Sequence, residues 1–243
     1  MQIDISGIAA VFPDFRVAVL VASDLAIREA RPPELGATIA ERAQACRARW
    51  AATELSEIPG IAVWRRAYRA FGIKKTSYRS SVERLVKNAL AGRDLPRVNA
   101  FVDLYNAVSL THVLPLGADD LDRIVPPLAF RYARDGDSFV DMADGAGEDE
   151  DEGGGNNGNG AAPKPGEVVY ADAAKVLCRR WNWRQDARSL ITPQTTRAVV
   201  TLQANGWGDL ERAVHDLADL IVRYCGGDCR TAIADVARRS IVV

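Results

Sequence analysis

Three short polar residues recur at helical spacing within "VNAFVDLYNAVSLTHV", residues 98–113: Asn99, Asp103 and Asn106. Asp103 lies one turn from each asparagine, so a helix would bring all three side chains to one face. That face should otherwise be packed, and buried polar groups need hydrogen-bond partners. The three residues therefore either hold a neighbouring loop or line a pocket, and their spacing leaves both readings open.

A second candidate is "CRRWNWRQ", residues 178–185, where two tryptophans stand among three arginines. Proteins that bind single-stranded nucleic acid combine cations for the phosphates with flat rings on which bases stack. If residues 175–181 form a strand that continues, alternation places Trp181 and Trp183 on one face and Arg180, Asn182 and Arg184 on the other. Alternatively, the tryptophans belong to the core and the arginines form a solvated face.

The net charge of −1 conceals a basic segment, because residues 65–93 contain nine Lys or Arg and one acid, Glu83. Such a segment predicts an electrostatic surface for an anionic partner. The cations that we expect to contact RNA are Arg65, Arg66, Arg69, Lys74, Lys75, Arg79, Arg179 and Arg180. Much of the opposing charge lies in residues 144–166, an acidic, Gly- and Asn-rich segment predicted to be a disordered loop insertion.

Several function classes are excluded by missing signatures. The sequence has no phosphate-binding glycine loop, nucleophile elbow, zinc-protease helix or dinucleotide fingerprint. Two histidines and one C-x3-C pair cannot complete a zinc site, so we expect no metal and no cofactor. We also expect neither a signal peptide nor a membrane span, because apolar runs stay below about 18 residues. These features predict a reduced, cytoplasmic protein. Cys178 is expected to pack within a strand rather than to act as a nucleophile.

The periodicity predicts helices in the first half of the chain and strands in the second, which is typical of an α+β fold with a mixed sheet flanked by helices. We expect a single domain over residues 1–243. The predicted helices cover residues 34–57, 62–72, 80–92 (with serine caps), 98–113 and 209–225, and the predicted strands cover 15–22, 128–134, 167–172, 175–181 and 197–203.

The stretch "LPRVNAFVDLYNAVSLTHVLPLGADDLDRI", residues 95–124, resembles the signature of the B3/B4 domain. This domain is the editing module of the phenylalanyl-tRNA synthetase β subunit, with the pattern P-I-N-x-x-V-D-x-T-N-Y followed by G-Q-P-x-H-A-F-D. The match is closer to the freestanding B3/B4 proteins, with N-P-x-V-D-x-Y-N and L-P-x-G-G. Residues 166–185 and 191–203 fit the same group, so the resemblance covers roughly residues 60–225.

The resemblance implies a pocket at strand and helix ends that hydrolyses a wrongly charged aminoacyl-tRNA. Tyr105 falls where the synthetase has threonine, and Gly117 where it has the histidine of its editing site. The synthetase's glutamate falls near residues 201–203, where this chain has no acid. Specificity for tyrosine is therefore not expected.

From this match we predict that Asn106 and Thr196 hold a water, that backbone amides around Gly117 receive the oxyanion, and that the terminal hydroxyl of the tRNA assists. No acyl-enzyme is expected. The residues that we expect to contact substrate are Asn99, Asp103, Tyr105, Cys178, Trp181, Asn182 and Trp183.

Three functions remain open at this stage. The first is a freestanding trans-editing hydrolase of a mischarged aminoacyl-tRNA. The second is a non-catalytic tRNA or RNA binder on the same fold, and the third is a binder or hydrolase of small amino-acid conjugates. Steep salt dependence would indicate RNA, since phosphate contacts release counterions. The amino acid, the tRNA and the oligomeric state are not predicted.

Overall fold

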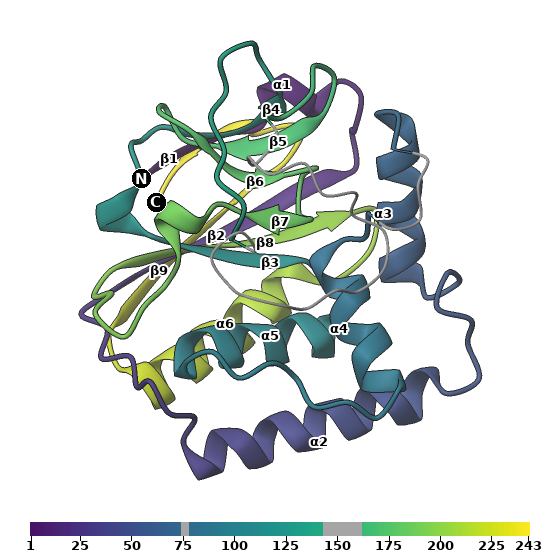
Figure 1. The fold of residues 1–243 in the computed structure, drawn as a ribbon, viewed down its shortest axis with the longest axis vertical. Helices are drawn as coiled ribbons and strands as arrows, with labels where there is room; N and C mark the ends of the chain where they lie inside the picture. Colours follow the sequence, from purple (N-terminus) through teal and green to yellow (C-terminus); the bar gives the residue numbers. More distant parts are fainter. Residues whose placement is uncertain (74–77, 143–161) are drawn as a thin grey trace.

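The computed structural model describes residues 1–73, 78–142 and 162–243. Two β-sheets stack face to face, and helices cover the outer face of one of them (Figure 1). In chain order the elements are β1 (Gln2–Asp4), α1 (Ser6–Ala9), β2 (Phe15–Ser23), α2 (Pro33–Trp50), α3 (Pro59–Ala70), α4 (Ser81–Leu90), α5 (Ala100–His112), β3 (Leu116–Asp120), η1 (Leu121–Arg123), β4 (Leu128–Tyr132), β5 (Val168–Ala171), β6 (Val176–Arg179), β7 (Arg184–Gln185), η3 (Ala187–Ser189), β8 (Ala198–Asn205), α6 (Leu210–Cys225), β9 (Asp228–Ala234) and β10 (Ser240–Val242).

The four-stranded sheet is antiparallel, with strand order β3-β8-β2-β9. Its central strand β2 pairs with β8 from Phe15 opposite Asn205 to Ala22 opposite Ala198. Successive residues of β2 point alternately toward the helices and toward the second sheet, and the residues on both faces are buried. Burial on both faces explains why this strand reads as a nearly continuous apolar run rather than as an alternation.

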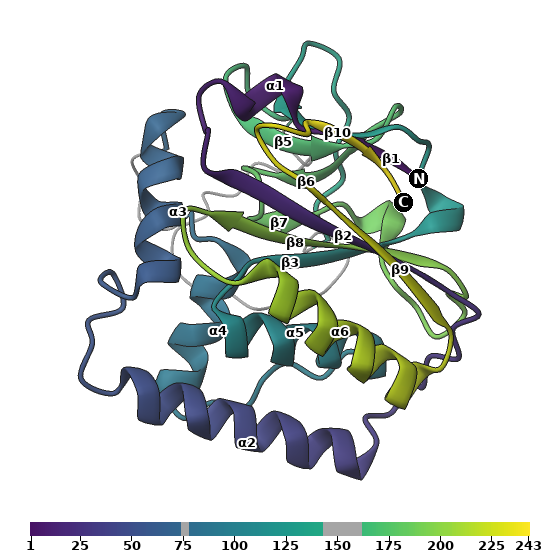
Figure 2. The same cartoon turned by 180° about the vertical axis from the view of Figure 1, so that it is seen from behind.

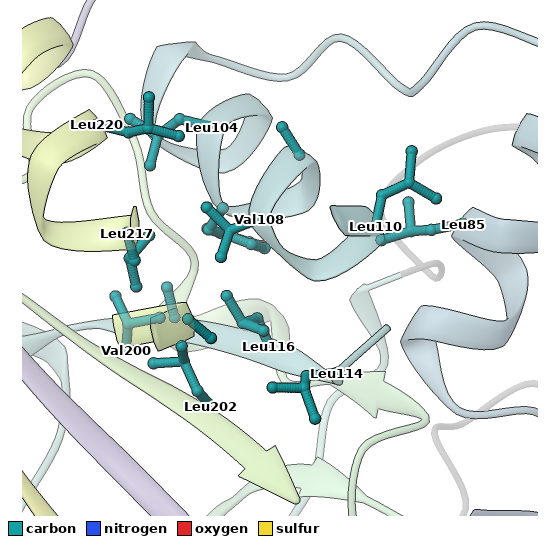
Figure 3. Packing of buried hydrophobic residues seen from close by; sticks show 14 of the residues in the cluster. Leu85, Leu104, Val108, Leu110, Leu114, Leu116, Val200, Leu202, Leu217 and Leu220 are labelled. Carbon is teal, nitrogen blue, oxygen red and sulfur yellow. The ribbon is translucent and has the colours of Figure 1, made fainter. Parts of the chain in front are cut away.

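Helix α5 is the centre of the helical layer. Helices α2, α4 and α6 pack around it on the side away from the second sheet (Figures 1 and 2). Figure 3 shows the resulting core, in which Leu104 of α5 lies beside Leu220 of α6. Val108 of α5 lies near Leu217 of α6 and above Leu116 and Val200 of the sheet. This packing fixes α5 over the sheet.

The six-stranded sheet has the order β10-β1-β4-β5-β6-β7 and is mixed, because β1 runs parallel to β4. Aromatic residues fill the space between the sheets. Trp181 is fully buried there, with its ring centroid 4.6 Å from that of Phe12, 4.9 Å from Phe15 and 5.1 Å from Trp64. Edge-on contacts of this kind stabilise aromatic clusters beyond area burial alone.

Most predicted elements are confirmed, and the differences have local causes. The helix predicted over residues 34–57 ends at Trp50, and Pro59 begins α3 at a position where the missing N–H costs nothing. Strand β6 ends at Arg179 because Arg180 and Trp181 adopt left-handed backbone, with φ of 46° and 69°. Ser80 precedes α4 but its side chain makes no capping hydrogen bond, so the predicted serine cap is wrong.

Part of the sequence prediction falls where the structure describes nothing. Residues 144–161 of the predicted loop insertion, and Lys74 and Lys75 of the basic segment, lie outside the described residues. Within the described ranges, no helix is long and apolar enough to cross a membrane. No group of three or more potential metal-binding side chains is found among these residues either.

Candidate functional site

A buried carboxyl group lies between the two sheets at the free edge of β3. Leu116 and Ala118 face the helical core, so Gly117 and Asp119 face the second sheet. Asp119 is 2% exposed, and its Oδ1 accepts hydrogen bonds from Ser189 Oγ at 2.6 Å and Gln185 Nε2 at 3.0 Å. Its Oδ2 accepts no hydrogen bond from any residue in the described ranges. One carboxylate oxygen is thus fixed and the other is available.

Burial raises the pKa of Asp119 to about 7, well above its ordinary value of 3.8. The hydrogen bonds from Ser189 and Gln185 and the charge of Lys175 oppose this rise without cancelling it. A carboxyl group with a pKa near neutrality exchanges protons at the pH at which most enzymes work, which is the property required of a general base.

Two tyrosines and a cysteine share this environment. Burial raises the pKa of Tyr105, Tyr170 and Cys178, and the charge of Asp119 raises each of them further. Tyr170 Oη is buried and has no hydrogen-bond partner among the described residues. Because a thiol must ionise to attack, the raised pKa makes Cys178 a poor nucleophile, as its sequence context predicted.

Gly117 provides space beside Asp119. A Cβ atom built on Gly117 would meet no atom within 4 Å. Hydrogen-bonded and non-hydrogen-bonded residue pairs alternate along β3 and β8. The backbone hydrogen bonds from Gln203 N to Pro115 O and from Leu121 N to Arg197 O show which pairs are the hydrogen-bonded ones. Gly117 therefore bonds with its partner Thr201, and the amide that points off the free edge of β3 belongs to Ala118. Of the backbone amides around Gly117 that are predicted to receive the oxyanion, that of Gly117 is engaged with Thr201 and that of Ala118 points off the free edge.

A second polar chain runs beside this site. Tyr68 Oη donates to Asn182 Oδ1 at 2.8 Å, and Asn182 Nδ2 donates to Gln203 Oε1 at 3.1 Å. Gln203 Nε2 in turn donates to Thr201 Oγ1 at 3.3 Å. These amides occupy the region in which the synthetase pattern has a glutamate. Asn182, predicted to contact substrate, is 4% exposed and holds this chain together.

Asn99 and Asp103 have structural roles. Asn99 caps α5 by accepting from Val102 N at 3.0 Å and donates to Ile191 O at 3.1 Å. Asp103 accepts from Arg31 Nε at 2.8 Å and from Val98 N at 3.0 Å. Both side chains are buried with these partners. The interpretation in which they hold neighbouring loops is confirmed, and their role as substrate contacts stays a prediction.

The two residues predicted to hold a water lie in different places. Asn106 is half-buried on α5, directly after Tyr105, and no hydrogen bond links its side chain to the Asp119 cluster within the described ranges. Thr196 is exposed and precedes β8 by two residues. Five residues of extended chain separate Thr196 from Thr201, the partner of Gly117, which is roughly 16 Å. The structure therefore does not bring Thr196 to the site.

The two tryptophans diverge instead of forming one platform. Trp181 is 0% exposed, so no base can stack on it. Trp183 is half-buried and packs edge-on against Tyr78, with ring centroids 5.1 Å apart. The guanidinium of Arg180 covers the Trp183 ring at 4.2 Å. The left-handed backbone at Arg180 and Trp181 breaks the alternation on which the predicted platform depended.

Most of the predicted RNA-contacting arginines in the described ranges have protein partners. Arg65 and Arg79 flank Glu83, with nearest N–O distances of 2.6 and 3.1 Å. Arg179 is 6% exposed and donates through two nitrogens to Glu167. These contacts contradict the prediction of Arg179 as a surface residue for RNA. Arg66 and Arg69 are exposed on α3.

The sequence analysis missed Asp119, Tyr170, Gln185 and Ser189. The available signal was weak: Asp119 is two positions after Gly117, so in a strand both residues face one side. A separate surface hollow with a volume of about 180 Å³ lies where α2 begins and α6 ends. It is lined by Arg28, Pro32, Glu34, Arg223 and Tyr224 and shares no residue with the Asp119 cluster.

Comparison with known proteins adds the family. No curated protein matches this chain. One solved structure with a similar arrangement is an N-terminal fragment of the phenylalanyl-tRNA synthetase β-subunit from Pyrococcus horikoshii, with 17% sequence identity and a TM-score of 0.38. The alignment covers 54% of this chain and 41% of that fragment. A family model described as the B3/4 domain matches residues 63–226, well over half of the sequence. The chain therefore belongs to the B3/4 domain family.

Proposed function

We propose that this protein hydrolyses the ester bond between an amino acid and the terminal ribose of an RNA, with Asp119 as the general base. The observation that carries the proposal is a buried carboxyl group with a pKa of about 7 that lies beside the open space at Gly117. Membership of the B3/4 domain family supports a substrate related to tRNA synthetases.

In this mechanism Asp119 Oδ2 takes a proton from a water that attacks the ester carbonyl carbon. The bond from carbon to the ribose oxygen then breaks, and the proton passes to that oxygen. In this proposal the Ala118 amide, which points off the edge of β3, donates a hydrogen bond to the oxyanion. Asn106 is retained as a candidate for orienting the water, and a free ribose hydroxyl can assist. Thr196 is dropped because of its distance along β8.

A second candidate is hydrolysis of a small amino-acid ester with no RNA attached. The observation that favours it is the partnering of basic residues, since Arg65, Arg79 and Arg179 all contact carboxylates. A smaller cationic surface predicts fewer phosphate contacts. Binding of an RNA substrate should weaken steeply with salt, whereas hydrolysis of a small ester should not.

The test is deacylation of a panel of correctly and incorrectly charged tRNAs, together with free amino-acid esters, by the wild type and by Asp119→Asn. We expect a loss of about 10²–10⁴-fold in the variant, the usual contribution of a general base. Asp122→Asn is the matched control, because Asp122 is exposed and three residues away. Equal rates for wild type and Asp119→Asn, with every substrate that turns over, would contradict the role of Asp119.

A further inference from the structure

Unsatisfied hydrogen-bond donors gather where α4 begins. Nine buried side-chain nitrogen or oxygen atoms in the described part of the chain have no hydrogen-bond partner. Seven of these atoms belong to residues 79–81 and 180–184. The two segments touch, because Ser81 N donates to Asn182 O at 2.9 Å. All seven atoms can donate. Arg79 Nε lies 3.1 Å from Glu83 Oε1, and Trp181 belongs to the core between the sheets, so five donors remain and the group that they lack is an acceptor.

The serines at the start of α4 are free to donate. Ser80 occupies the N-cap position, yet its Oγ caps no amide, and Ser81 Oγ is also unpartnered among the described residues. The Val82 amide lies in the first helical turn and has no acceptor within the helix. The first turn of a helix also carries partial positive charge. These groups converge on one end of α4.

Arg180 supplies a full charge beside them. Its guanidinium lies between the rings of Tyr78, at 3.4 Å, and Trp183, at 4.2 Å. Because both faces are stacked, only the N–H edge remains for hydrogen bonds. The side chain is 8% exposed, and Nε and Nη1 are buried without partners in the described ranges. Its closest carboxylate oxygen, on Glu167, is 3.9 Å away and already accepts from Arg179.

The neighbouring carboxylates are fully engaged by other arginines. Glu83 Oε1 accepts from Arg65 Nη2 at 2.6 Å, and Glu83 Oε2 accepts from Arg65 Nε at 3.2 Å. In the described ranges, the charged groups around this place include five arginines, Arg65, Arg79, Arg179, Arg180 and Arg184, and three acids, Glu83, Asp141 and Glu167. Burial lowers the pKa of Arg180, because it disfavours the charged guanidinium. A bound anion would stabilise that charge.

We propose that the start of α4 and the Arg180 edge form a binding site for a phosphate group. Phosphate fits better than carboxylate, because it offers more acceptor oxygens for these donors and, as a monoester, carries up to two negative charges. The rings of Tyr78 and Trp183 hold the guanidinium, at a point where Arg180 and Trp181 adopt a left-handed backbone that is unfavourable for residues with side chains. The site is independent of the hydrolysis proposed above and can be measured without turnover.

The experiment measures binding of inorganic phosphate, AMP and a short single-stranded RNA to the full chain by calorimetry, with acetate at equal ionic strength as the comparison. We expect phosphate, but not acetate, to raise Tm by about 3–6 °C at tenfold above Kd. We expect Arg180→Gln to weaken phosphate binding at least tenfold. Combined Ser80→Ala and Ser81→Ala should weaken it about three- to tenfold, and Arg212→Gln, an exposed arginine on α6, should leave it unchanged.

The arms separate the sources of the phosphate. Tighter binding of AMP than of RNA identifies a terminal phosphate, and tighter binding of RNA identifies a backbone diester. Either outcome supports the site, provided that the Ser80 and Ser81 substitutions weaken binding of the same ligand. If Arg180→Gln fails to fold, the phosphate affinity of the combined Ser80→Ala and Ser81→Ala variant alone tests the site. Absence of phosphate binding by the folded wild type, equal binding of acetate, or unchanged affinity in the serine variant would overturn the proposal.

Discussion

Replacing Asp119 with asparagine should stabilise the folded protein at neutral and alkaline pH. Asparagine keeps the shape and an Oδ1 that accepts from both Ser189 and Gln185, so the hydrogen bonds at 2.6 and 3.0 Å survive. Only the buried charge is removed. Because the unfolded chain ionises Asp119 near 3.8 and the folded chain near 7, the folded state binds more protons between these values. The free energy of unfolding of the wild type therefore falls as pH rises through this window.

The magnitude follows from the pKa. A rise from 3.8 to about 7 corresponds to about 4 kcal/mol, which is an upper limit because the surroundings relax around the charge. We expect Asp119→Asn and wild type to agree within about 1 kcal/mol near pH 4. Above pH 7 the variant should be more stable by roughly 2–4 kcal/mol, with no further change at higher pH.

Urea unfolding of both proteins at several pH values between about 4 and 8.5 measures this difference directly. Asp122→Asn, at an exposed carboxylate, should follow the wild type at every pH. A constant difference between Asp119→Asn and wild type across the range would refute the reasoning, as would a variant that is less stable at pH 8. If the same variant gains stability and loses hydrolysis, the buried charge serves the reaction and not the fold.

Three further predictions concern other residues. Trp181→Ala should lower the free energy of unfolding by about 3–5 kcal/mol because it empties the aromatic centre between the sheets; a cost below about 1 kcal/mol in urea unfolding would contradict this role. Asp216→Asn should lose about 2 kcal/mol at pH 7, because the contacts from His112 and Arg42 outweigh burial and lower the pKa of Asp216 to about 2. The stability that Asp216 contributes is present above pH 3.8 and is lost as pH falls through 2, which is opposite in sign to the pH dependence of Asp119. Unfolding measured across acid pH checks this. Gly117→Val should change the free energy of unfolding by less than about 1 kcal/mol but reduce hydrolysis, since the side chain enters open space; unchanged rates in the deacylation assay would exclude that space from the site.

The elements that could be predicted from the sequence are those with a long run of apolar residues or a long apolar periodicity. β2 is nine residues of valine-rich chain, and α5 has apolar residues over three turns, so both are predicted almost to their ends. β1, β7 and β10 have two or three residues each, which is too short for any periodicity. The pairing of β1 with β4 and β10 also depends on partners distant in sequence, whereas β7 pairs with β6, which directly precedes it.

The site was less predictable for two physical reasons. The alternation of side chains assumed for residues 175–183 fails at Arg180 and Trp181, where the backbone is left-handed. As a result the ring of Trp181 lies in the core and that of Trp183 lies away from it. The importance of Asp119 depends on burial, and burial depends on which face of β3 the second sheet covers. Asn99 and Asp103 were correctly predicted to be buried and bonded, but the identity of their partners, Ile191 and Arg31, requires the tertiary structure.

The place of β2 in the four-stranded sheet has a consequence during synthesis. Its neighbours β8 and β9 pair with it through residues such as Ala198 and Ala234, far later in the chain. At translation rates of about 5–20 residues per second, β2 emerges roughly 10–35 s before the first of them. For that time a valine-rich segment has both edges unpaired, which is the condition under which nascent chains aggregate. Yield of folded protein should therefore depend on holding chaperones and on growth temperature more strongly than the stability of the finished sheet would suggest.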